Sequence, residues 1–436
     1  MPSKNAAAFD KRRLPLVLLA GGTVIDPAKG AARRADVLIE NGRITAVGPG
    51  LKSPHAERID CAGKHITPGF VDMHCHLREP GREDEETIAS GAAAALAGGF
   101  TRICPMPNTE PPVDTEAQVR FQVRRGEEAG LGRIHPIGCC TKARAGKEMA
   151  EIGAMVTAGA VGFSDDGSPV ADPMVMRRCL EYAQAFDVPV ISHCETRELV
   201  EGLANEGRLS TRLGLKTSPD VAESTQAARD ILLAEFTNGR LHIAHVSSRV
   251  TVDLVRWAKA RGVQVTAETC PHYFALTEEA LAEFDTNCKV NPPLRAEADR
   301  RAIVKGLADG TIDAIATDHA PHLKGEKDAE WDAAPPGMIG FETAFSLGYE
   351  ELVLGKALGL PDYIARLSTT PAGILGFDLP GIRPDAPAEL VILDLKATWS
   401  YGATGIRSRS SNSPFIGRTL RGRVTAALLG DSLITL

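Results

Sequence analysis

The sequence predicts an α/β protein: a (β/α)8 TIM barrel with a small β domain formed by the two chain ends. Three observations support this prediction. Short apolar runs alternate with helix-like stretches, polar residues suited to metal binding follow nearly every run, and both chain ends read as strands between Gly, Pro and Ser turns. We expect the barrel to span residues 67–375 and the β domain to combine residues 1–66 with 376–436.

Strand and turn signals define the two ends of the chain. At the N-terminal end, Ala35–Glu40 and Arg43–Gly48 flank Asn41-Gly42, a pair that supplies the positive φ angles of a tight hairpin. At the other end, two segments either alternate apolar with polar residues or are continuously apolar; they are Ala388–Asp394 and Gly422–Leu429. We therefore expect the two ends to pair into one β domain.

Eight apolar runs in the middle of the chain are the expected barrel strands. They are Gly69–His76, Phe100–Asn108, Ile134–Cys140, Ala160–Asp166, Val188–Glu195, Leu241–Ser247, Val263–His272 and Ile312–His322. The expected helices between them include Asp84–Ala97, Glu116–Ala129, Pro173–Phe186, Val221–Phe236 and Val250–Ala260. An open doubly wound sheet is disfavoured, because it would gather functional residues at one switch point rather than at nearly every strand end.

Composition excludes several classes of protein. The 436 residues are 43% hydrophobic and 24% charged, which is enough for a large packed core. A net charge of -7 without a strongly basic block argues against a nucleic-acid partner, and no run approaches the roughly 20 apolar residues of a membrane span. The nine cysteines lack paired spacing, so we expect a reduced chain in the cytoplasm.

The strongest local signal is His74-Cys75-His76 at the end of the first run. Residues two apart on a strand share a face, so the two imidazoles can reach one metal ion. Later strand ends add further imidazoles and carboxylates, which are His193, His245, Asp318 and the adjacent pair Asp165 and Asp166. Together the strand ends offer more ligands than one tetrahedral centre needs, which indicates two metal ions sharing a bridge.

Motifs for other chemistries are missing from the sequence. There is no Gly-x-Ser-x-Gly nucleophile elbow, no Gly-x-x-x-x-Gly-Lys-[Ser/Thr] phosphate loop and no Gly-x-Gly-x-x-Gly after a strand. Metal-assisted hydrolysis is therefore the favoured reaction class.

Five segments give the chain a resemblance to the dihydroorotase family, in the class I branch of the cyclic amidohydrolases. The segments occur in family order and the resemblance covers nearly the whole chain; they are Gly69–Gly81, Met106–Thr109, Phe163–Gly167, Val290–Arg295 and Asp318–His322. Many relatives bridge their metals with a carboxylated lysine, but residues 160–167 contain no lysine. This departure points away from hydantoinases and allantoinases.

The resemblance implies a metal centre with assigned ligands. His74 and His76 would hold one divalent ion, and His193 and His245 the second, with Asp166 as the bridge. Asp166 is chosen over Asp165 by its intervals to the histidines, and Asp165 is expected to be structural. Zinc is the expected metal, with manganese and cobalt left open.

The resemblance also implies the reaction. The expected activity is the reversible cyclisation of N-carbamoyl-L-aspartate to (S)-dihydroorotate and water in pyrimidine biosynthesis. A hydroxide held between the two metals would attack the ring carbonyl in the reverse direction. Asp318 would contact the first metal and act as general acid and base.

A substrate pocket with a carboxylate-binding arginine is expected beside the metals. Arg78 lies two residues past His76 and offers a forked donor set to the substrate carboxylate; the alternative is a surface ion pair with Glu79 or Glu83. The other expected substrate contacts are His76, Asn108, Asn291, His322, Pro336 and Gly337. Among the remaining histidines, His272 and His319 border the site with undecided roles, whereas His55, His65, His135 and His242 are expected to be structural.

The residues present disfavour two alternative functions. A hydantoinase-like or allantoinase-like amidase is disfavoured by Arg78, Asn108 and the missing lysine. A non-catalytic subunit supporting aspartate transcarbamoylase is disfavoured because all six ligand positions hold competent residues. The family resemblance implies a small-molecule substrate and a homodimer, and makes aspartate transcarbamoylase a candidate partner.

Overall fold

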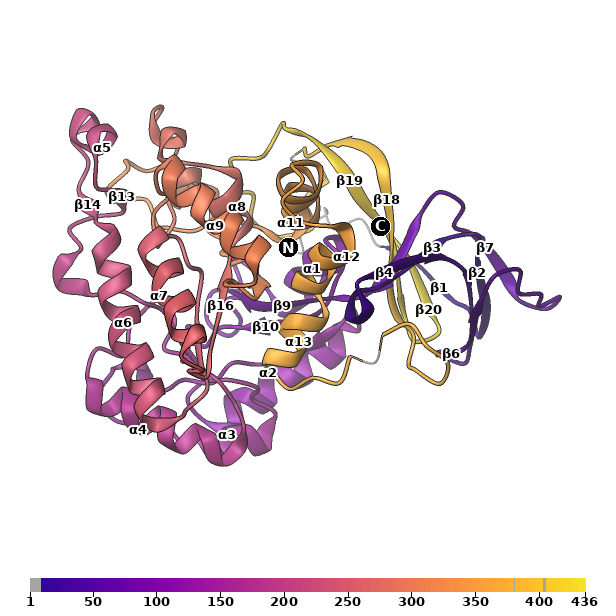
Figure 1. Cartoon of the computed structure of the whole chain (residues 1–436), viewed down its shortest axis with the longest axis horizontal. Helices are drawn as coiled ribbons and strands as arrows, with labels where there is room; N and C mark the ends of the chain where they lie inside the picture. The colour runs from indigo at the N-terminus through magenta and orange to yellow at the C-terminus, as the bar shows by residue number, and fades with distance from the viewer. Residues whose placement is uncertain (1–8, 380, 403–404) are drawn as a thin grey trace.

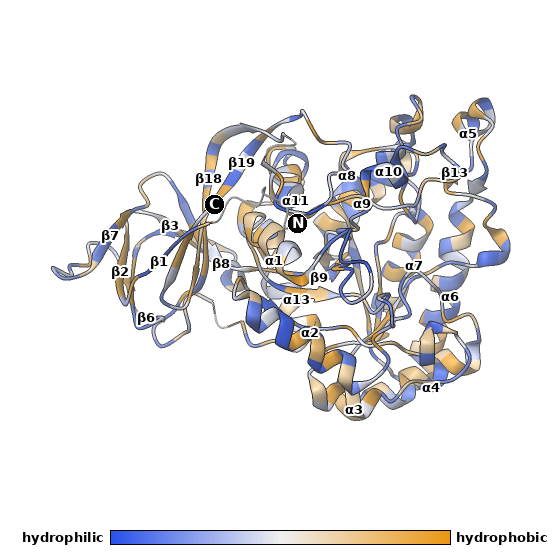
Figure 2. Ribbon diagram, turned by 180° about the vertical axis from the view of Figure 1, so that it is seen from behind, coloured by the Kyte–Doolittle hydropathy of each residue, from blue (hydrophilic) through white to orange (hydrophobic). Residues whose placement is uncertain are grey.

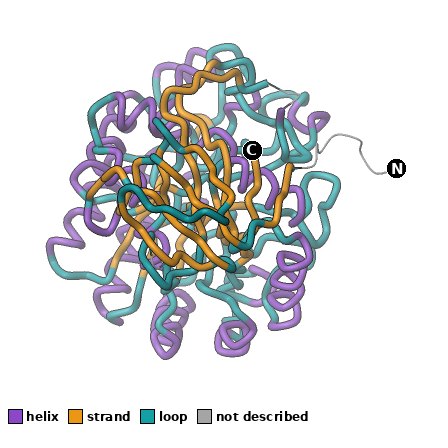
Figure 3. The backbone as a smooth tube through the Cα atoms, turned by 90° about the vertical axis from the view of Figure 1, so that its right-hand side faces the viewer, coloured by secondary structure: helices purple, strands orange, loops and turns teal. Residues whose placement is uncertain are grey.

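The structure, a computed structural model, describes residues 9–379, 381–402 and 405–436. A helix-rich barrel lies beside a smaller β unit (Figure 1). Viewed from the side of the β unit, the strands occupy the middle and the helices surround them (Figure 3). Among the described residues, no helix is long and apolar enough to cross a membrane.

Parallel pairing joins the strands of the barrel. They are β9 (Phe70–Cys75), β10 (Phe100–Pro105), β11 (Arg133–Ile134), β12 (Val190–Ser192), β15 (Leu241–Ile243), β16 (Val265–Thr269) and β17 (Ala314–Ile315). Phe163 bridges to Gly138 on one side and to Val190 on the other, and Cys75 pairs with His319. These bridges close the ring, so the predicted barrel is confirmed.

Several observed strands are shorter than the expected runs, for example β11, β12 and β17, and the fourth run forms no strand. Ala160–Asp166 was expected as a strand, but its only ladder residue is Phe163. Gly159, at φ 114°, interrupts the extended backbone before the run, and a turn from Asp165 to Ser168 follows at its end. The segment still lies in the barrel wall, because the Phe163 amide donates to Pro189 O over 3.1 Å.

A hydrogen-bonded seam joins the first and last strands of the barrel. Asp72 in β9 accepts hydrogen bonds from the Thr317 amide over 3.0 Å and from the Thr317 hydroxyl over 2.5 Å. The Asp318 amide then donates to His74 O over 3.0 Å, and the His76 amide to His319 O over 2.8 Å. This seam holds two strand ends that carry candidate ligands side by side.

The expected helices are present, with small differences at their ends. They are α1 (Ile88–Ala97), α2 (Glu116–Ala129), α4 (Pro173–Ala183), α6 (Asp220–Thr237) and α7 (Arg249–Ala260). Helix α1 begins four residues later than expected, because the Thr87 and Ser90 side chains form a capping box. Helix α4 begins after Asp172, whose carboxylate accepts from the Met174 amide over 2.7 Å.

Shorter and additional helices complete the barrel part. They are α3 (Ile152–Ala158), α5 (Arg208–Leu213), α8 (Pro271–Ala275), α9 (Glu297–Asp309), α10 (Lys324–Lys327), α11 (Phe341–Gly348), α12 (Leu360–Leu367) and α13 (Thr369–Ile374). A short parallel pair, β13 (Ala204–Asn205) with β14 (Thr217–Ser218), lies in a loop. Helix α1 is largely hydrophobic along its length (Figure 2), and seven of its ten residues are buried, namely Ile88 and the six from Gly91 to Leu96.

Strands from both chain ends share one sheet of the β unit. Its order is β1-β20-β19-β18-β8-β3-β4, with a second sheet in the order β6-β5-β2-β7. The bounds are β1 (Asp10–Arg13), β2 (Leu16–Ala20), β3 (Thr23–Asp26), β4 (Ala31–Arg34), β5 (Asp36–Glu40), β6 (Arg43–Gly48), β7 (Glu57–Asp60), β8 (His65–Pro68), β18 (Glu389–Ser400), β19 (Thr419–Leu429) and β20 (Ser432–Thr435). The pairing of the two ends is confirmed, whereas the boundaries at residues 66 and 375 stay a prediction.

The two sheets pack over a shared apolar core, and the predicted hairpin lies in the smaller sheet. Side chains such as Val17 and Ile39 from one sheet and Leu390 and Leu428 from the other are buried in one cluster. The hairpin turn has φ 48° at Asn41 and φ 75° at Gly42, as the Asn-Gly pair predicts. Burial of this cluster stabilises the composite unit.

A buried ion pair fastens the β unit to the barrel. Arg102 in β10 donates to both carboxylate oxygens of Glu389 at the start of β18, each over 2.8 Å. The Thr101 hydroxyl adds a bond of 2.7 Å to the same carboxylate. Arg102 and Glu389 are only 4% and 9% exposed, so water stabilises neither charge and each is stabilised by the other.

We expect Glu389→Ala to lower the free energy of unfolding by about 3–5 kcal/mol, because Arg102 would be left buried without its partner. Urea denaturation measures the change. Glu57→Ala is the matched control, since its pair with Arg12 is exposed and should contribute no more than about 1 kcal/mol. Equal midpoints for the two variants would show that the buried pair does not fasten the domains.

Candidate metal centre and substrate cavity

The six predicted ligands converge where the barrel strands end. His74 lies in β9 and His76 just beyond it, and the other four follow the later strand segments. All six side chains are buried, with exposures between 0% and 7%; they are His74, His76, Asp166, His193, His245 and Asp318. Parallel strands in a barrel bring such ends to one face, so residues far apart in sequence meet there.

One half of the cluster combines His74 and His76 with two carboxylates. His76 Nε2 lies 3.1 Å from Asp318 Oδ1 and 3.6 Å from Asp166 Oδ2. His74 Nε2 lies 3.4 Å from Asp166 Oδ1 and 3.6 Å from Asp318 Oδ1. The two imidazoles and two carboxylates thus surround one small volume.

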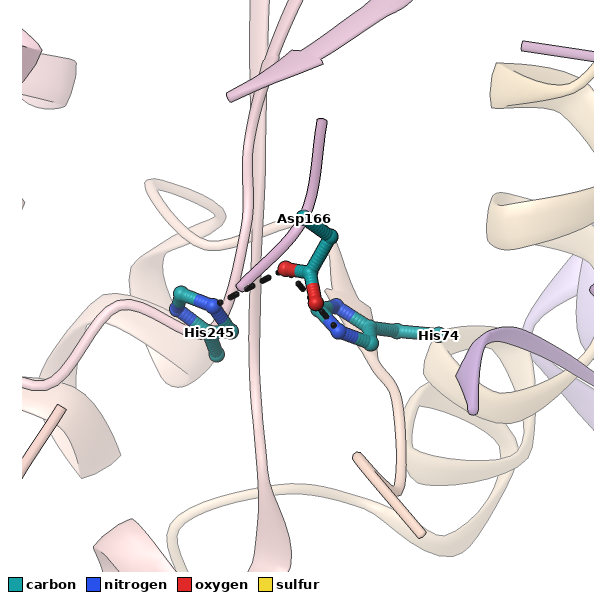
Figure 4. Close-up of side chains that lie close together, drawn as sticks. All are labelled: His74, Asp166 and His245. Atoms are coloured by element: carbon teal, nitrogen blue, oxygen red, sulfur yellow. Dashed lines mark ion pairs between the residues drawn. The ribbon is translucent and has the colours of Figure 1, made fainter. Parts of the chain in front are cut away.

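The other half of the cluster joins His193 and His245 to the same aspartate. His193 Nδ1 and His245 Nε2 lie 2.8 Å apart, and each is 3.5 Å from Asp166 Oδ1. Figure 4 shows Asp166 between His74 and His245, with its carboxylate directed at both rings. Asp166 therefore stands between the two halves, in the place that a bridging ligand requires.

Two buried polar atoms in this cluster point to a cation. His74 Nε2 and Asp166 Oδ1 are buried and have no hydrogen-bond partner, although they lie only 3.4 Å apart. An unsatisfied buried polar atom is costly, and a metal ion between imidazole and carboxylate groups would satisfy both. The donor set therefore fits divalent ions.

The electrostatics keep the carboxylates ionised. Burial alone would raise the pKa of Asp166, but the imidazoles of His74, His193 and His245 hold it well below its usual range. For Asp318, burial acts in the same direction and the hydrogen bond with His76 again lowers the pKa. Both groups are thus anionic at neutral pH, as metal ligands must be.

A carboxylate behind the cluster orients His74, and the sequence did not single it out. Glu268 Oε1 lies 2.7 Å from His74 Nδ1, and Glu268 Oε2 lies 3.4 Å from His242 Nε2. Burial would raise the pKa of Glu268, but these two imidazoles lower it to about 2. The signal that could have revealed Glu268 is an acidic residue inside the buried strand β16.

Beside the cluster lies a cavity of about 240 Å³. All seven residues predicted to contact substrate line it; they are His76, Arg78, Asn108, Asn291, His322, Pro336 and Gly337. Six further residues complete the lining, and they are Asp166, Gly167, His193, His245, Asp318 and Ala320. One space therefore touches both metal-binding and carboxylate-binding groups.

Arg78 faces this cavity and has a different partner from the ones expected. Its Nε lies 3.1 Å from Glu85 Oε2 and donates to Pro321 O over 3.1 Å, while its Nη2 lies 3.3 Å from His322 Nε2. The expected alternative, a surface pair with Glu79 or Glu83, was wrong, because the Arg78 side chain is 12% exposed and turned inward.

Two further polar contacts shape the cavity wall. Asn108 Oδ1 lies 2.8 Å from His76 Nδ1. Asn291 Nδ2 donates to Glu195 Oε2 over 2.8 Å, and the same oxygen lies 3.5 Å from His193 Nε2. Glu195 therefore connects a predicted substrate contact to a predicted metal ligand, a role that the sequence did not assign.

The undecided residues near the site have distinct surroundings. His319 stacks on Phe341 at 4.1 Å between ring centres and accepts from the Gly340 amide. His272 is buried, which lowers its pKa to about 4, and it groups with Cys270 and Asp318. Asp165 accepts from the Thr141 amide over 3.0 Å, a contact that agrees with the structural role predicted for it.

Solved structures with the same architecture include two hydantoinases. The L-hydantoinase (dihydropyrimidinase) of Arthrobacter aurescens matches with a TM-score of 0.84 and 23% identity, over 95% of this chain and 94% of that one. A D-hydantoinase matches with a TM-score of 0.81 and 24% identity, over 96% and 95%. At these identities the likeness shows the fold alone.

Sequence relatives identify the family of the chain. A family model described as Dihydro-orotase-like matches residues 63–251. The dihydroorotase of Pelobacter propionicus is 47% identical over 96% of this chain and 99% of its own length, and that of Syntrophotalea carbinolica is 47% identical over 96% and 98%. The chain belongs to the dihydroorotase family.

We expect Glu268→Gln to weaken metal binding by about 10- to 100-fold, because the amide cannot hold the His74 ring as the carboxylate does. Competition with a chelator, read by elemental analysis of the protein, measures the loss. Glu342→Gln is the control, since it changes a buried carboxyl that contacts none of the candidate ligands. Equal metal retention in all three proteins would remove Glu268 from this role.

Proposed function

We propose that the protein is a zinc-dependent dihydroorotase that interconverts N-carbamoyl-L-aspartate and (S)-dihydroorotate in pyrimidine biosynthesis. The family membership supports the activity. The observation that carries the proposal is the single cavity in which Arg78 lies with Asp318 and the imidazoles of the cluster. A substrate with a carboxylate and a cyclic amide needs this combination of groups.

The proposed metal assignment follows the two halves of the cluster. His74 and His76 would hold one ion, His193 and His245 the other, with Asp166 between them and Asp318 on the first. Imidazole and carboxylate ligands suit zinc. When bound there, two such ions would lower the pKa of a water and would act as Lewis acids toward the substrate carbonyl.

Asp318 is the proposed proton carrier. Its Oδ1 lies 3.1 Å from His76 Nε2, and the residue lines the cavity, so it reaches both the metal cluster and the bound ring. In hydrolysis it would take a proton from the attacking water and give it to the ring nitrogen as the C–N bond breaks. In cyclisation it would remove that proton from the carbamoyl nitrogen.

Arg78 is the residue proposed to bind the substrate carboxylate. Glu85 and Pro321 O hold its Nε, which leaves the outer guanidinium nitrogens beside His322 and the cavity. A forked, buried guanidinium binds a carboxylate with two parallel hydrogen bonds. Hydantoin has no carboxylate, so Arg78 would favour dihydroorotate over hydantoin.

The assembly and location of the protein stay predictions from the family resemblance. We propose a homodimer in the cytoplasm, with aspartate transcarbamoylase as a candidate partner. Light scattering of the purified protein, with and without the transcarbamoylase, measures both states of assembly.

The deciding experiment is hydrolysis of L-dihydroorotate by the purified chain, with metal content determined on the same sample. We expect chelator-sensitive turnover of dihydroorotate, with hydantoin and allantoin as poor substrates. Faster turnover of hydantoin would replace the proposal by a hydantoinase. Bound metal without any turnover, even after addition of aspartate transcarbamoylase, would favour a non-catalytic subunit.

Arg78→Ala should lower kcat/KM for dihydroorotate by about 100-fold or more, because truncation removes one partner of a buried charge pair. Steady-state kinetics at matched metal content measure the effect. Arg82→Ala is the control, since Arg82 is 42% exposed and pairs with Glu85 and Glu326 outside the cavity lining. Unchanged kinetics for Arg78→Ala would contradict the proposal that Arg78 binds the substrate carboxylate.

Asp318→Asn should keep the fold and lower kcat by about 100- to 10,000-fold, because the amide cannot carry the proton. Circular dichroism and metal analysis confirm that the protein is intact before kcat is measured. Asp313→Asn, in the same barrel unit but bonded to Lys259, should leave kcat near its original value. Substantial residual turnover by Asp318→Asn would assign the proton transfer elsewhere.

A further inference from the structure

Two lysines are buried beneath the loop that forms one wall of the cavity. Lys289 and Lys327 are 5% and 3% exposed, and neither has a carboxylate within ion-pair distance among the described residues. Their ammonium groups donate instead to backbone carbonyls. A buried charge without a counter-charge is unusual and calls for a reason.

The carbonyls belong to one loop, residues 331–337, which follows α10 (labelled in Figure 2). Lys289 Nζ donates to Trp331 O over 2.5 Å, to Asp332 O over 3.2 Å and to Ala334 O over 2.7 Å. Lys327 Nζ donates to Pro335 O over 2.9 Å and to Gly337 O over 3.0 Å. Five of the seven loop carbonyls therefore turn toward the two ammonium groups.

This loop has no regular secondary structure. It forms no helix or strand, and its two prolines have no amide hydrogen to donate. The Ala333 and Ala334 amides donate to Glu330 O, and the Gly337 amide donates to Lys289 O over 2.8 Å, which ties the loop to the same lysine through its backbone. The two ammonium groups therefore supply hydrogen bonds that neither a helix nor a strand provides here.

The arrangement carries an electrostatic cost. Burial, together with the neighbouring charge of Lys289, lowers the pKa of Lys327 to about 8. Burial also lowers the pKa of Lys289. Two like charges kept close together inside a protein must be offset by the contacts that they make, and here those contacts all end on the loop.

The loop is connected directly to the groups that face the substrate. Pro336 and Gly337 line the cavity, and Pro336 O lies 2.8 Å from His322 Nε2. Asn412 Nδ2 donates to Gly337 O over 3.1 Å, while Asn412 Oδ1 accepts from the His322 amide. A shift of the loop would therefore move His322 and the cavity wall together.

The fit between loop and cavity is tight at Gly337. Its φ is 136°, and an added Cβ would lie 2.8 Å from Ala320 Cβ and 3.0 Å from His322 Nε2. The backbone at this position thus passes close to Ala320 and His322 and leaves no room for a side chain.

We propose that Lys289 and Lys327 are positioning residues that set substrate affinity by holding loop 331–337 as the wall of the cavity. The proposal rests on the proposed function, because it assigns the cavity to the substrate. Neither lysine lines the cavity, so each acts through the loop.

The kinetic test uses Lys327→Met and Lys289→Met, which keep the length of the side chain and remove its charge. We expect KM for L-dihydroorotate to rise about tenfold and kcat to change less than about threefold, because the loop contributes binding rather than chemistry. Lys324→Met is the matched control, since Lys324 is exposed on the same helix and pairs with Asp328. A fall in kcat at constant KM, or kinetics equal to the control, would overturn the proposal.

A second measurement does not depend on the substrate. Amide hydrogen exchange of peptides covering 328–340 should be faster in both lysine variants and unchanged in Lys324→Met. Unchanged exchange would overturn the proposal that the lysines hold the loop, even if KM rises. If the wild-type protein does not turn over dihydroorotate, the proposed function fails, and exchange alone then decides whether the lysines hold the loop.

A third variant guards against misfolding. If Lys327→Met gives little folded protein, Lys327→Arg keeps a cation that can still donate to Pro335 O and Gly337 O. We expect its exchange and KM to lie between those of the wild-type protein and a neutral variant. Exchange as fast as that of Lys289→Met would show that a cation at this position does not order the loop.

Discussion

The seam between the first and last barrel strands is the contact on which the site depends. Asp72 binds both the amide and the hydroxyl of Thr317, and the next residue, Asp318, bonds to the backbone of His74. If the barrel stayed open at this point, the carboxylate of Asp318 would not meet the imidazoles of β9. Closure of the fold and assembly of the ligand cluster are therefore the same event.

Most of the barrel, and the meeting of the six candidate ligands at one face of it, could be predicted from local patterns together with the family resemblance. An apolar run that ends in His or Asp places that side chain at a strand end, and closure then brings the ends together. The extent of strands was harder to predict. Around Phe163 the run is too short and too polar to form more than a bridge, although its hydrogen bonds still complete the wall.

The groups that support the ligands could not be predicted in the same way. Glu268 meets His74 across 194 positions of the chain. Arg78, whose backbone has a φ of 59°, pairs with Glu85 rather than with Glu79 or Glu83, and a local pattern does not show which acid it meets. Lys289 and Lys327 look like ordinary surface residues in the sequence. Their importance appears only when five carbonyls of one loop are seen to face them.

The composite sheet of the β unit constrains the order in which the chain folds. Pro68 in β8 pairs with Leu390 in β18, about 320 residues later. During synthesis at roughly 5–20 residues per second, the edge of β8 would wait for tens of seconds before its partner leaves the ribosome. The barrel has time to form in that interval, so the N-terminal strands must stay free of wrong partners until the end of the chain arrives.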